Sequence, residues 1–460
     1  MKRLIFIAMC VAASMIGFSA SAQMRSSYFM EGSYFRTDLN PALAPTRGYV
    51  ALPGLGGFGM NINNNFLSVD NFFYKNGDEV VTALHESVSA DKFLGKLPNT
   101  GRLSANLNTN LLGVGFHTKK HFWNFGINLR SNNEITLSKD IFKALKTLGN
   151  GYYDLNKTSL SSTSFAEIYV GHSRKVVDLK FGRLTAGARV KFLVGLMNAS
   201  TEIDQMYPNI SSESVTAHLE GKIRANGPIF DPSKVIAGKE FSDDVITDDI
   251  EMILNNVSNF GAAIDLGAEM SLLNDRLRVS AAVTDLGFIK WSPKTHIEAD
   301  ARADFYFNGV NLDTEEADSD GDANVLMTKV KDAGYATRLN CALNLGAEYN
   351  VLGDRIGFGL LSHTEFCQMM TFSELTASVN FRPLNWISAS LSHTLLSHNK
   401  LGVFGFALNI HPTGVNIYLG ADYIPTKMVK YESASIPYSM KSFNMYMGIG
   451  FNLGRAKSLK

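Results

Sequence analysis

The densest set of possible metal ligands lies in one acidic run. Asp318, Asp320 and Asp322 alternate with Ser319 and Gly321. Carboxylate oxygens at alternate positions are ligands that Ca²⁺ prefers. The run lacks the sixth-position glycine and the closing glutamate of an EF-hand loop, so a calcium site and a solvated acidic loop are both open alternatives.

The sequence carries no signature of catalysis. Neither His-Glu-x-x-His nor Gly-x-Ser-x-Gly occurs, and we predict that the chain is not an enzyme and, calcium aside, has no cofactor. His117 and His121 flank an expected turn, where a metal-binding pair and two ordinary surface histidines are the alternatives. Residues 54–59 match Gly-x-Gly-x-x-Gly, but the strand–helix–strand unit that makes this pattern bind a nucleotide does not follow.

The elements that must position polar side chains are long strands, and residues 259–291 show the pattern best. Apolar residues alternate there with small or polar ones, and the alternation breaks once, at Asn274-Asp275. This period of two with a short turn predicts a hairpin. A turn at that point places Leu272 opposite Leu277 and Leu266 opposite Val283, which makes one face apolar and the other polar. Strands of this length with such faces are typical of a membrane-spanning barrel.

The same pattern recurs along the chain. Two of the later hairpins are predicted to pair Phe381 with Ile387 and Leu408 with Ile417. Residues 214–226 and 295–310 also alternate, but we place both in extracellular loops. All tight turns then lie on one side of the membrane, and about fourteen strands span it, which is an even number as bacterial barrels require. We therefore predict an all-β fold, a transmembrane antiparallel β-barrel.

Two kinds of side chain should mark the barrel wall. Trp123, Trp386 and Trp291 fall near expected strand ends, where aromatic girdles meet the membrane interfaces. Charged residues on the polar faces should line the lumen. They could form a selective polar path or bind a segment inside the barrel, or they could simply pair with one another, as charges do in the interior of any barrel. These are Arg183, Arg189, Lys191, Asp265, Glu269, Arg278, Glu348, Glu374 and Arg382.

The chain opens with a secretory signal. Basic Lys2 and Arg3 precede an apolar run that ends in the small residues Ala20-Ser21-Ala22, so we expect residues 1–22 to be removed. The 43 basic and 43 acidic residues balance, which argues against a nucleic-acid partner. Cys341 and Cys367 fall on opposite faces of neighbouring strands and should be free thiols.

The remaining divisions follow from pattern and composition. Residues 23–47 are irregular, residues 48–454 carry the strands, and residues 455–460 form a short tail. Three amphipathic helices are expected in extracellular loops, over residues 79–97, 139–148 and 243–257. The third would present a row of apolar side chains that either captures a hydrophobic ligand or packs over the barrel mouth, namely Val245, Ile246, Ile250 and Ile253.

Two short motifs resemble a known superfamily. The run Asn40-Pro41-Ala42 resembles the Asn-Pro-Ala segment of FadL-like and PorV-like outer-membrane barrels, and residues 283–291 resemble a strand-end signature of an uncharacterised, Bacteroidota-type branch with a domain of unknown function. The resemblance implies an N-terminal plug in the lumen over residues 23–47, to which these three residues would belong.

Two functions follow as expectations for such a barrel in the bacterial outer membrane. The first is FadL-like passage or binding of a small hydrophobic molecule. The alternative, which the PorV-like resemblance implies, is a non-transporting barrel that acts as a scaffold or partner in a surface or secretion complex. Lipid of the outer membrane would be a partner in either case.

Overall fold

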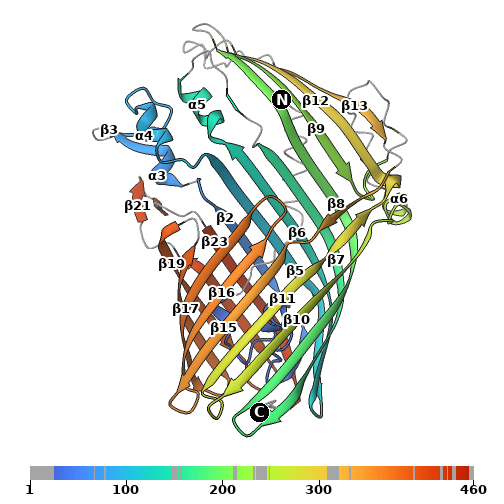
Figure 1. Cartoon of the computed structure of the whole chain (residues 1–460), viewed down its shortest axis with the longest axis vertical. Helices are drawn as coiled ribbons and strands as arrows, with labels where there is room; N and C mark the ends of the chain where they lie inside the picture. The colour runs from blue at the N-terminus through green and yellow to red at the C-terminus, as the bar shows by residue number, and fades with distance from the viewer. Residues whose placement is uncertain are drawn as a thin grey trace.

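The chain folds into a closed antiparallel β-barrel of fourteen strands, shown in Figure 1 as a computed structural model. The structure describes residues 25–66, 68–76, 79–147, 153–154, 158–210, 215–231, 234, 246–247, 249–307, 321–330, 333–396, 399–424, 428–431, 434–437 and 442–454. The predicted signal peptide and the C-terminal tail lie outside these residues.

Two of the fourteen wall positions are each occupied by two successive strands. β1 and β2 both pair with β5 and β23, and β14 and β15 both pair with β11. In ring order the wall consists of β1 (Gly48–Ala51) with β2 (Phe58–Asn64), β5 (Thr100–Thr118), β6 (His121–Ser138), β7 (Ser159–Leu179), β8 (Gly182–Ile210), β10 (Phe260–Leu272), β11 (Leu277–Trp291), β14 (Tyr335–Arg338) with β15 (Cys341–Val351), β16 (Ile356–Phe366), β17 (Thr371–Leu384), β18 (Ile387–Leu396), β19 (Asn399–Ile410), β20 (Asn416–Ile424) and β23 (Ser442–Leu453). The last strand pairs with β1 and β2 and closes the ring.

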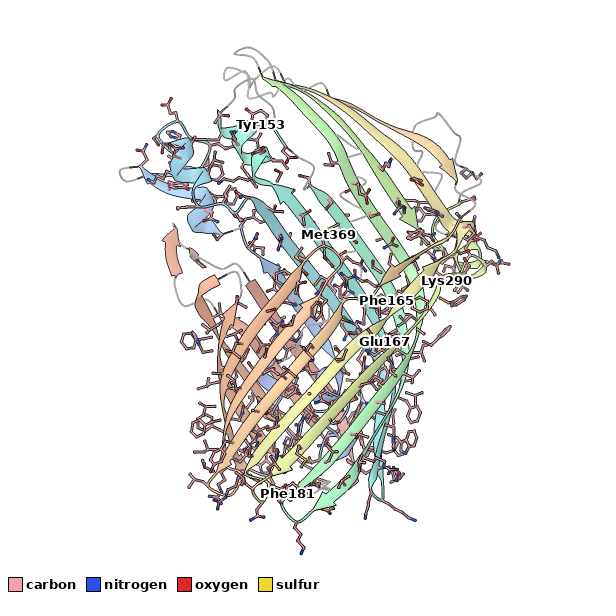
Figure 2. The ribbon with its side chains drawn as sticks, viewed as in Figure 1. Tyr153, Phe165, Glu167, Phe181, Lys290 and Met369 are labelled. Atoms are coloured by element: carbon pink, nitrogen blue, oxygen red, sulfur yellow. The ribbon has the colours of Figure 1, made fainter. Side chains whose placement is uncertain are left out.

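Alternation of side chains gives the wall two different faces. The predicted pairs Leu272–Leu277 and Leu266–Val283 are confirmed. Large apolar side chains point outward and are exposed, whereas asparagine, serine, threonine and charged residues point inward and are buried. Figure 2 shows the outer side chains around the lower wall, where Phe181 marks the turn end, and Met369 lies toward the other end. This distribution is the inverse of that in a soluble protein.

All six tight turns lie at one end, as the topology argument predicts; we call it the turn end and the opposite one the loop end. Two hairpin registers were predicted wrongly. Ile387 pairs with Leu384 and not with Phe381, because β17 continues two residues beyond Arg382 before it turns. Leu408 pairs with Leu419, because the last turn is centred one residue later than expected.

The two doubtful segments form β9 (Val215–Asn226) and β12 (His296–Phe307), and neither enters the ring. The turn-end part of β8 pairs with β10, and its loop-end part, from Asn198 to Ile210, pairs with β9. β12 joins β9 and carries β13 (Gly321–Val330) on its other edge. The three strands therefore form a wing that lengthens one side of the wall beyond the loop end (Figure 1).

Short helices and hairpins lie at the loop end and inside the lumen. Helices in the loops are α3 (Val69–Phe72), α4 (Ala90–Leu94), α5 (Lys139–Thr147) and α6 (Ile250–Asn255), and η4 (Pro293–Thr295) precedes β12. Small hairpins are formed by β3 (Phe73–Asn76) with β4 (Glu79–Thr82) and by β21 (Met428–Tyr431) with β22 (Ala434–Pro437). Inside the barrel lie η1 (Arg25–Ser27) and α2 (Arg36–Leu39). No helix among the described residues is long and apolar enough to span a membrane.

Two of the three predicted loop helices differ from expectation. Residues 79–97 do not form one helix: their first four residues make β4, and only Ala90–Leu94 is helical, capped by Ser89. The helix predicted over 139–148 is confirmed as α5. The third is shorter than predicted, because Asp249 caps it and it begins at Ile250.

Candidate functional site: the filled lumen

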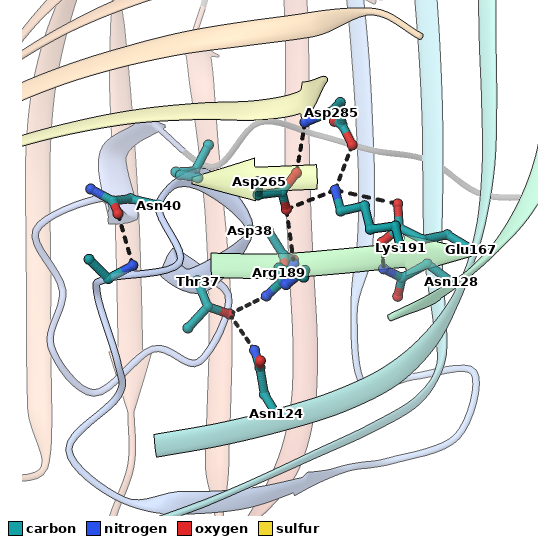
Figure 3. A network of polar contacts seen from close by, with 12 residues as sticks. Thr37, Asp38, Asn40, Asn124, Asn128, Glu167, Arg189, Lys191, Asp265 and Asp285 are labelled. Atoms are coloured by element: carbon teal, nitrogen blue, oxygen red, sulfur yellow. Dashed lines mark hydrogen bonds and ion pairs between the residues drawn. The ribbon is translucent and has the colours of Figure 1, made fainter. Parts of the chain in front are cut away.

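Residues 25–47, which we call the inner segment, run inside the barrel (Figure 3). Their apolar side chains are buried and form one cluster with the inner wall, made of Tyr28, Phe29, Met30, Tyr34, Phe35, Leu39, Leu43, Tyr49, Ala51, Phe122, Leu361, Ala407, Tyr418 and Tyr446. Tyr34 stacks on Tyr49 with 4.3 Å between ring centroids. Burial raises the pKa of Tyr34 well above its ordinary value, so its hydroxyl stays protonated and donates to the Gly56 carbonyl oxygen over 2.6 Å.

The start of the inner segment is held by carboxylates of the wall. The backbone N–H groups of Arg25 and Ser26 each donate to the carboxylate of Asp422 on β20, over 3.1 Å. The Arg25 guanidinium forms an ion pair of 2.8 Å with Glu374 on β17. Ser26 Oγ lies 2.7 Å from Ser392 Oγ on β18. The segment is thus fixed to three strands on one side of the ring.

The Asn40-Pro41-Ala42 run packs against the opposite side. The Asn40 side chain accepts a hydrogen bond of 2.9 Å from the Ala42 backbone, which closes a local turn, and it donates to the Tyr28 hydroxyl over 3.1 Å. The run lies directly on the backbone of Gly187 and Gly267, where a Cβ would meet its atoms at 2.3 Å and 2.0 Å. Glycine at both wall positions is what allows this close approach.

The turn end of the inner segment has its own contacts. Glu31 pairs with Arg278 on β11, and Arg47 donates to Thr413 in the last turn over 3.4 Å. The His411 ring lies against Gly32, leaving no room for a Cβ there. Burial, reinforced by the positive charge of Arg47, lowers the pKa of His411 to about 4. This imidazole is therefore neutral at physiological pH.

A cluster of charges crosses the lumen beside the inner segment; we call it the charged bridge and define it as Arg130, Glu167, Lys191, Asp265 and Asp285. Figure 3 labels the last four of these residues. Arg130 on β6 binds both oxygens of Asp285 on β11, over 2.7 and 2.9 Å, although four steps of strand pairing separate these strands. Lys191 lies 2.6 Å from Asp285 and 2.9 Å from Asp265. Multiple charge-assisted contacts of this kind are the condition under which buried charges are tolerated.

The inner segment is joined to this bridge through Arg189. Its guanidinium pairs with Asp38 of the inner segment over 2.6 Å and donates to Thr37 over 2.9 Å. It stacks over the Tyr169 ring, with 4.3 Å from the guanidinium carbon to the ring centroid. Arg189 also lies 4.0 Å from Asp265, so the inner segment and the charged bridge form one connected network.

A β-bulge places Asp285 in this network. Pairing between β10 and β11 shifts between Ile264 and Leu266, and Asp285 has φ of +60°. Thr284 and Asp285 consequently both turn inward, and every later residue of β11 has the opposite orientation from the one that strict alternation gives. Trp291 is therefore only 1% exposed and packs inside the barrel, so its predicted place in an outer girdle is wrong.

Nearer the loop end, opposite walls touch directly. Asn106 on β5 donates to Glu365 on β16 over 3.2 Å, and these strands lie seven pairing steps apart in either direction round the ring. Glu134 on β6 accepts the backbone N–H groups of Gln368 and Met369, over 2.9 and 2.7 Å. These contacts, which we call the upper bridge, cross the lumen above the inner segment.

The predicted lumen residues all point inward, and the structure joins most of them to the inner segment. Arg189, Arg278 and Glu374 bind it through ion pairs, and Arg382 donates to the Phe29 carbonyl over 2.7 Å and pairs with Glu348. Glu269 lies 3.9 Å from Arg36. Arg183 instead pairs with Asp275 at the turn end.

Sequence reasoning missed four members of the network, namely Asp38, Arg130, Glu167 and Asp285. Arg130 and Glu167 occupy inward positions that alternation of β6 and β7 would have given. Asp285 could not be found in this way, since the bulge reverses its orientation.

The other predicted sites are not brought together. Ile246 precedes α6 and bridges to Phe230, Ile250 and Ile253 lie on α6, and Val245 lies outside the described residues. In the acidic run, Asp318 and Asp320 lie outside the described residues, and Asp322 lies on β13. His117 bonds to the Pro45 carbonyl while His121 pairs with His172, and no group of three metal-ligating residues occurs in the described part of the chain. Cys341 and Cys367 are free.

Residues 41–422 match the model of a Family of unknown function (DUF5723). The chain belongs to this family. The match runs from Pro41 to Asp422, so it includes the end of the inner segment, most of the wall and the charged bridge, and it begins one residue after Asn40. No curated protein matches the chain.

Several solved barrels are similar in fold. A FadL homologue from Pseudomonas aeruginosa is 8% identical with a TM-score of 0.38, over 95% of this chain and 99% of that one. The toluene transporter TodX of Pseudomonas putida is 9% identical with a TM-score of 0.33, over 95% and 94%. The translocator domain of the autotransporter NalP from Neisseria meningitidis is 8% identical with a TM-score of 0.31, over 93% and 97%.

Proposed function

We propose that the chain is a bacterial outer-membrane barrel, closed at rest by its inner segment, that passes or binds a small hydrophobic molecule. Membrane insertion is supported by the outer face, where Val190, Phe192 and Leu266 are 61%, 49% and 49% exposed and have similar neighbours around the ring. An apolar surface of this extent is unfavourable in water and favourable in lipid.

The observation that carries the gating part of the proposal is how the inner segment is held. It is not a strand of the wall, and besides its apolar cluster with the wall it is held by ion pairs and hydrogen bonds to Asp422, Glu374 and Arg189. None of these contacts belongs to the strand pairing that closes the ring. The segment can therefore leave the lumen while the wall stays intact, and this is what a plug requires.

The hydrophobic nature of the passenger is supported by the loop end. Phe66, Phe72, Phe93 and Phe142 form a cluster of aromatic rings over β5 and β6, with centroids 5.6 to 6.2 Å apart. Leu84, which follows Ala83 of the same buried cluster, and Leu145 on α5 are exposed. The cluster itself is largely buried, so it is the exposed leucines that offer a first contact for an apolar molecule. The Asn-Pro-Ala resemblance to FadL-like plugs agrees with this role.

A second candidate function is a permanently closed barrel that serves as a scaffold in a surface or secretion complex. The upper bridge favours it, because Asn106–Glu365 and the Glu134 contacts cross the lumen independently of the inner segment. The wing of β9, β12 and β13 would give such a scaffold an extended edge outside the membrane.

Ion conductance in a planar bilayer separates these functions if four forms of the mature chain are compared. They are the wild type, a deletion of the inner segment, the upper-bridge pair Glu134→Ala with Glu365→Ala, and the combination. We expect conductance only from the combination, because each single change leaves one barrier in place.

A second experiment tests the apolar surface of the loops. Binding of the neutral fluorophore Nile red is compared between the wild type and the variant Leu84→Asp.

The folded state of each form is verified by its heat-dependent gel mobility. If the combined variant is folded and silent, passage through the lumen is excluded and the scaffold function is favoured. Conductance from the wild type would show that the inner segment does not close the lumen. Equal Nile red binding by wild type and Leu84→Asp would remove the loop end as the first contact.

A further inference from the structure

A groove crosses the outer face of the wall from β8 to β17. Its volume is about 510 Å³, and its lining is almost entirely apolar. Four of the lining residues are successive cross-strand partners and form one row across the strands, namely Ala268, Ala281, Leu345 and Ser362. Leucine, methionine and valine side chains of the next row toward the turn end form its rim. The small alanine side chains leave the hollow between them.

The row that lines the groove continues beyond it to a set of basic residues. Ala268 pairs with Ala186 on β8, Ala186 pairs with Arg174 on β7, and Arg174 pairs with His121 on β6. His121 Nδ1 lies 2.9 Å from Nε2 of His172, so the two imidazoles share a hydrogen bond. We call His121, His172 and Arg174 the basic cluster. It lies in line with the groove, at its turn-end side.

The basic cluster lies where the apolar part of the outer face ends. The Trp123 ring is next to it, with 4.3 Å between its centroid and that of His172. Exposed Phe116 and Phe125 stack on each other beside Trp123, with centroids 6.1 Å apart. Tryptophan is enriched at the level of lipid headgroups. The basic cluster is therefore placed at the membrane interface on the turn-end side.

Positive charge is in excess around the cluster. Lys119 and Lys120 in the adjacent turn are exposed. Asp178, near the turn between β7 and β8, is already paired with Lys175 over 2.7 Å. Within the described part of the chain, the guanidinium of Arg174 forms no ion pair and no hydrogen bond. An anion with several acceptor oxygens is the complementary partner for such a group.

The row climbs away from the turn end as it runs from the cluster to the groove. His121 directly follows its turn, whereas Ser362 lies in the middle of β16, because the strands are tilted (Figure 1). Five steps of strand pairing separate Arg174 from Ser362, which is about 24 Å at about 4.8 Å per step. At the usual tilt of about 35–45°, this path rises by about 14–17 Å. That is close to half of a hydrocarbon core of about 30 Å, the depth of one leaflet.

We propose that the basic cluster and the groove together bind one anionic phospholipid of the leaflet on the turn-end side. The phosphate binds Arg174 and the histidines at the level of the headgroups, and one acyl chain follows the row of alanines into the groove. Charge, apolar lining and length match the two ends of a single lipid molecule. The inference rests on insertion of the barrel in the membrane, and it does not depend on whether the lumen passes a molecule.

Native mass spectrometry of the full mature barrel in a mild detergent tests the site, with dioleoylphosphatidylglycerol as the probe. We expect one molecule to bind saturably. Dioleoylglycerol, which lacks the phosphate, and glycerol phosphate, which lacks the chains, should each bind at least about tenfold more weakly. The double variant His121→Gln with Arg174→Gln should weaken binding of the probe about tenfold, and so should Ala281→Leu, which fills the groove.

Two matched controls separate this site from ordinary contact with lipid. Arg355→Gln changes an exposed arginine in another turn, and Ala389→Leu changes the outer face of β18, so neither should alter the affinity. If Ala281→Leu does not fold, as judged by gel mobility, Ala268→Leu fills the same groove in its place. Equal affinity in the wild type and the double variant, an equal loss in the controls, or a dimer that binds no lipid would overturn the proposal. None of these results would change the conductance expected of the lumen.

Discussion

Gly187 on β8 and Gly267 on β10 are cross-strand partners, and the Asn40-Pro41-Ala42 run lies against both. A Cβ at Gly187 would approach the Pro41 carbonyl carbon to 2.3 Å. Two glycines side by side on a barrel wall weaken the strands, since glycine loses more conformational entropy on folding than other residues. Their presence at this point shows that close approach of the inner segment is built into the wall.

Gly187→Ala should displace the inner segment while the barrel stays folded. Overpacking of this kind costs about 1–3 kcal/mol, and the inner segment, unlike the wall strands, is not held by strand pairing. Trypsin cleavage after Arg36 in the purified protein measures the displacement. Ala268→Leu, next to Gly267 but on the outer face, is the matched control and should leave cleavage at the wild-type rate. Unchanged protection in Gly187→Ala would mean that the run does not rest on the glycines.

Asp285→Asn should destabilise the barrel by about 3–5 kcal/mol, because it leaves Arg130 and Lys191 buried with too little negative charge. The comparison is Asp275→Asn, which removes the partly exposed partner of Arg183 at the turn end and should cost about 0–1 kcal/mol. Urea unfolding in detergent gives both values. Similar values for the two variants would contradict the importance of the charged bridge.

Acid should loosen the turn end of the inner segment through His411. Its pKa in the folded chain is about 4, below the ordinary histidine value of about 6.5, so the unfolded state binds the proton first as pH falls. The stabilisation is complete above about pH 6.5 and falls by about 3 kcal/mol by pH 4. Arg47 opposes protonation and Glu31 favours it.

Hydrogen exchange of the Gly32 amide between pH 7 and pH 4, corrected for the intrinsic pH dependence of exchange, measures this effect. His411→Gln should flatten the dependence, because glutamine does not titrate. An equal loss of protection in both proteins would assign the acid response to other groups.

A charged residue on the outer face should destabilise the barrel more when it lies deeper in the membrane. Val190→Arg, in the middle of β8, should cost about 2–4 kcal/mol in lipid vesicles, and Phe181→Arg, at the turn end, about 0–1 kcal/mol. Unfolding by guanidinium in vesicles gives the two values. If Val190→Arg cost no more than Phe181→Arg, the apolar outer face would not lie in the membrane core.

The wall could be predicted from the sequence because apolar residues recur at every second position of its strands. Each expected cross-strand pair of apolar residues is a further check on the strand register. The pairing of Leu266 with Val283 and the exclusion of residues 214–226 and 295–310 from the ring both follow from alternation and turn placement. Errors arose where the strand was irregular: the bulge at Asp285 turned Trp291 inward, and Leu384 extended β17 past its expected turn.

The contents of the lumen were less predictable. That Arg189 faces inward follows from the period of two, but its pairing with Asp38 does not, because residues 25–47 carry no regular pattern and no strand register to place them. Contact between Asn106 and Glu365 is also beyond sequence reasoning, since it depends on how closely opposite walls approach.

The presence of the inner segment in the lumen is tested most directly by a disulfide between it and the wall. Ser26 Oγ and Ser392 Oγ are 2.7 Å apart, close enough for paired cysteines at these positions to form a bond of about 2 Å. The background carries Cys341→Ser and Cys367→Ser. In the outer membrane, Ser26→Cys with Ser392→Cys should oxidise to an intrachain disulfide, whereas Ser26→Cys with Ser388→Cys, nearer the turn end of β18, should remain reduced. A folded barrel in which the first pair stays reduced would contradict the account.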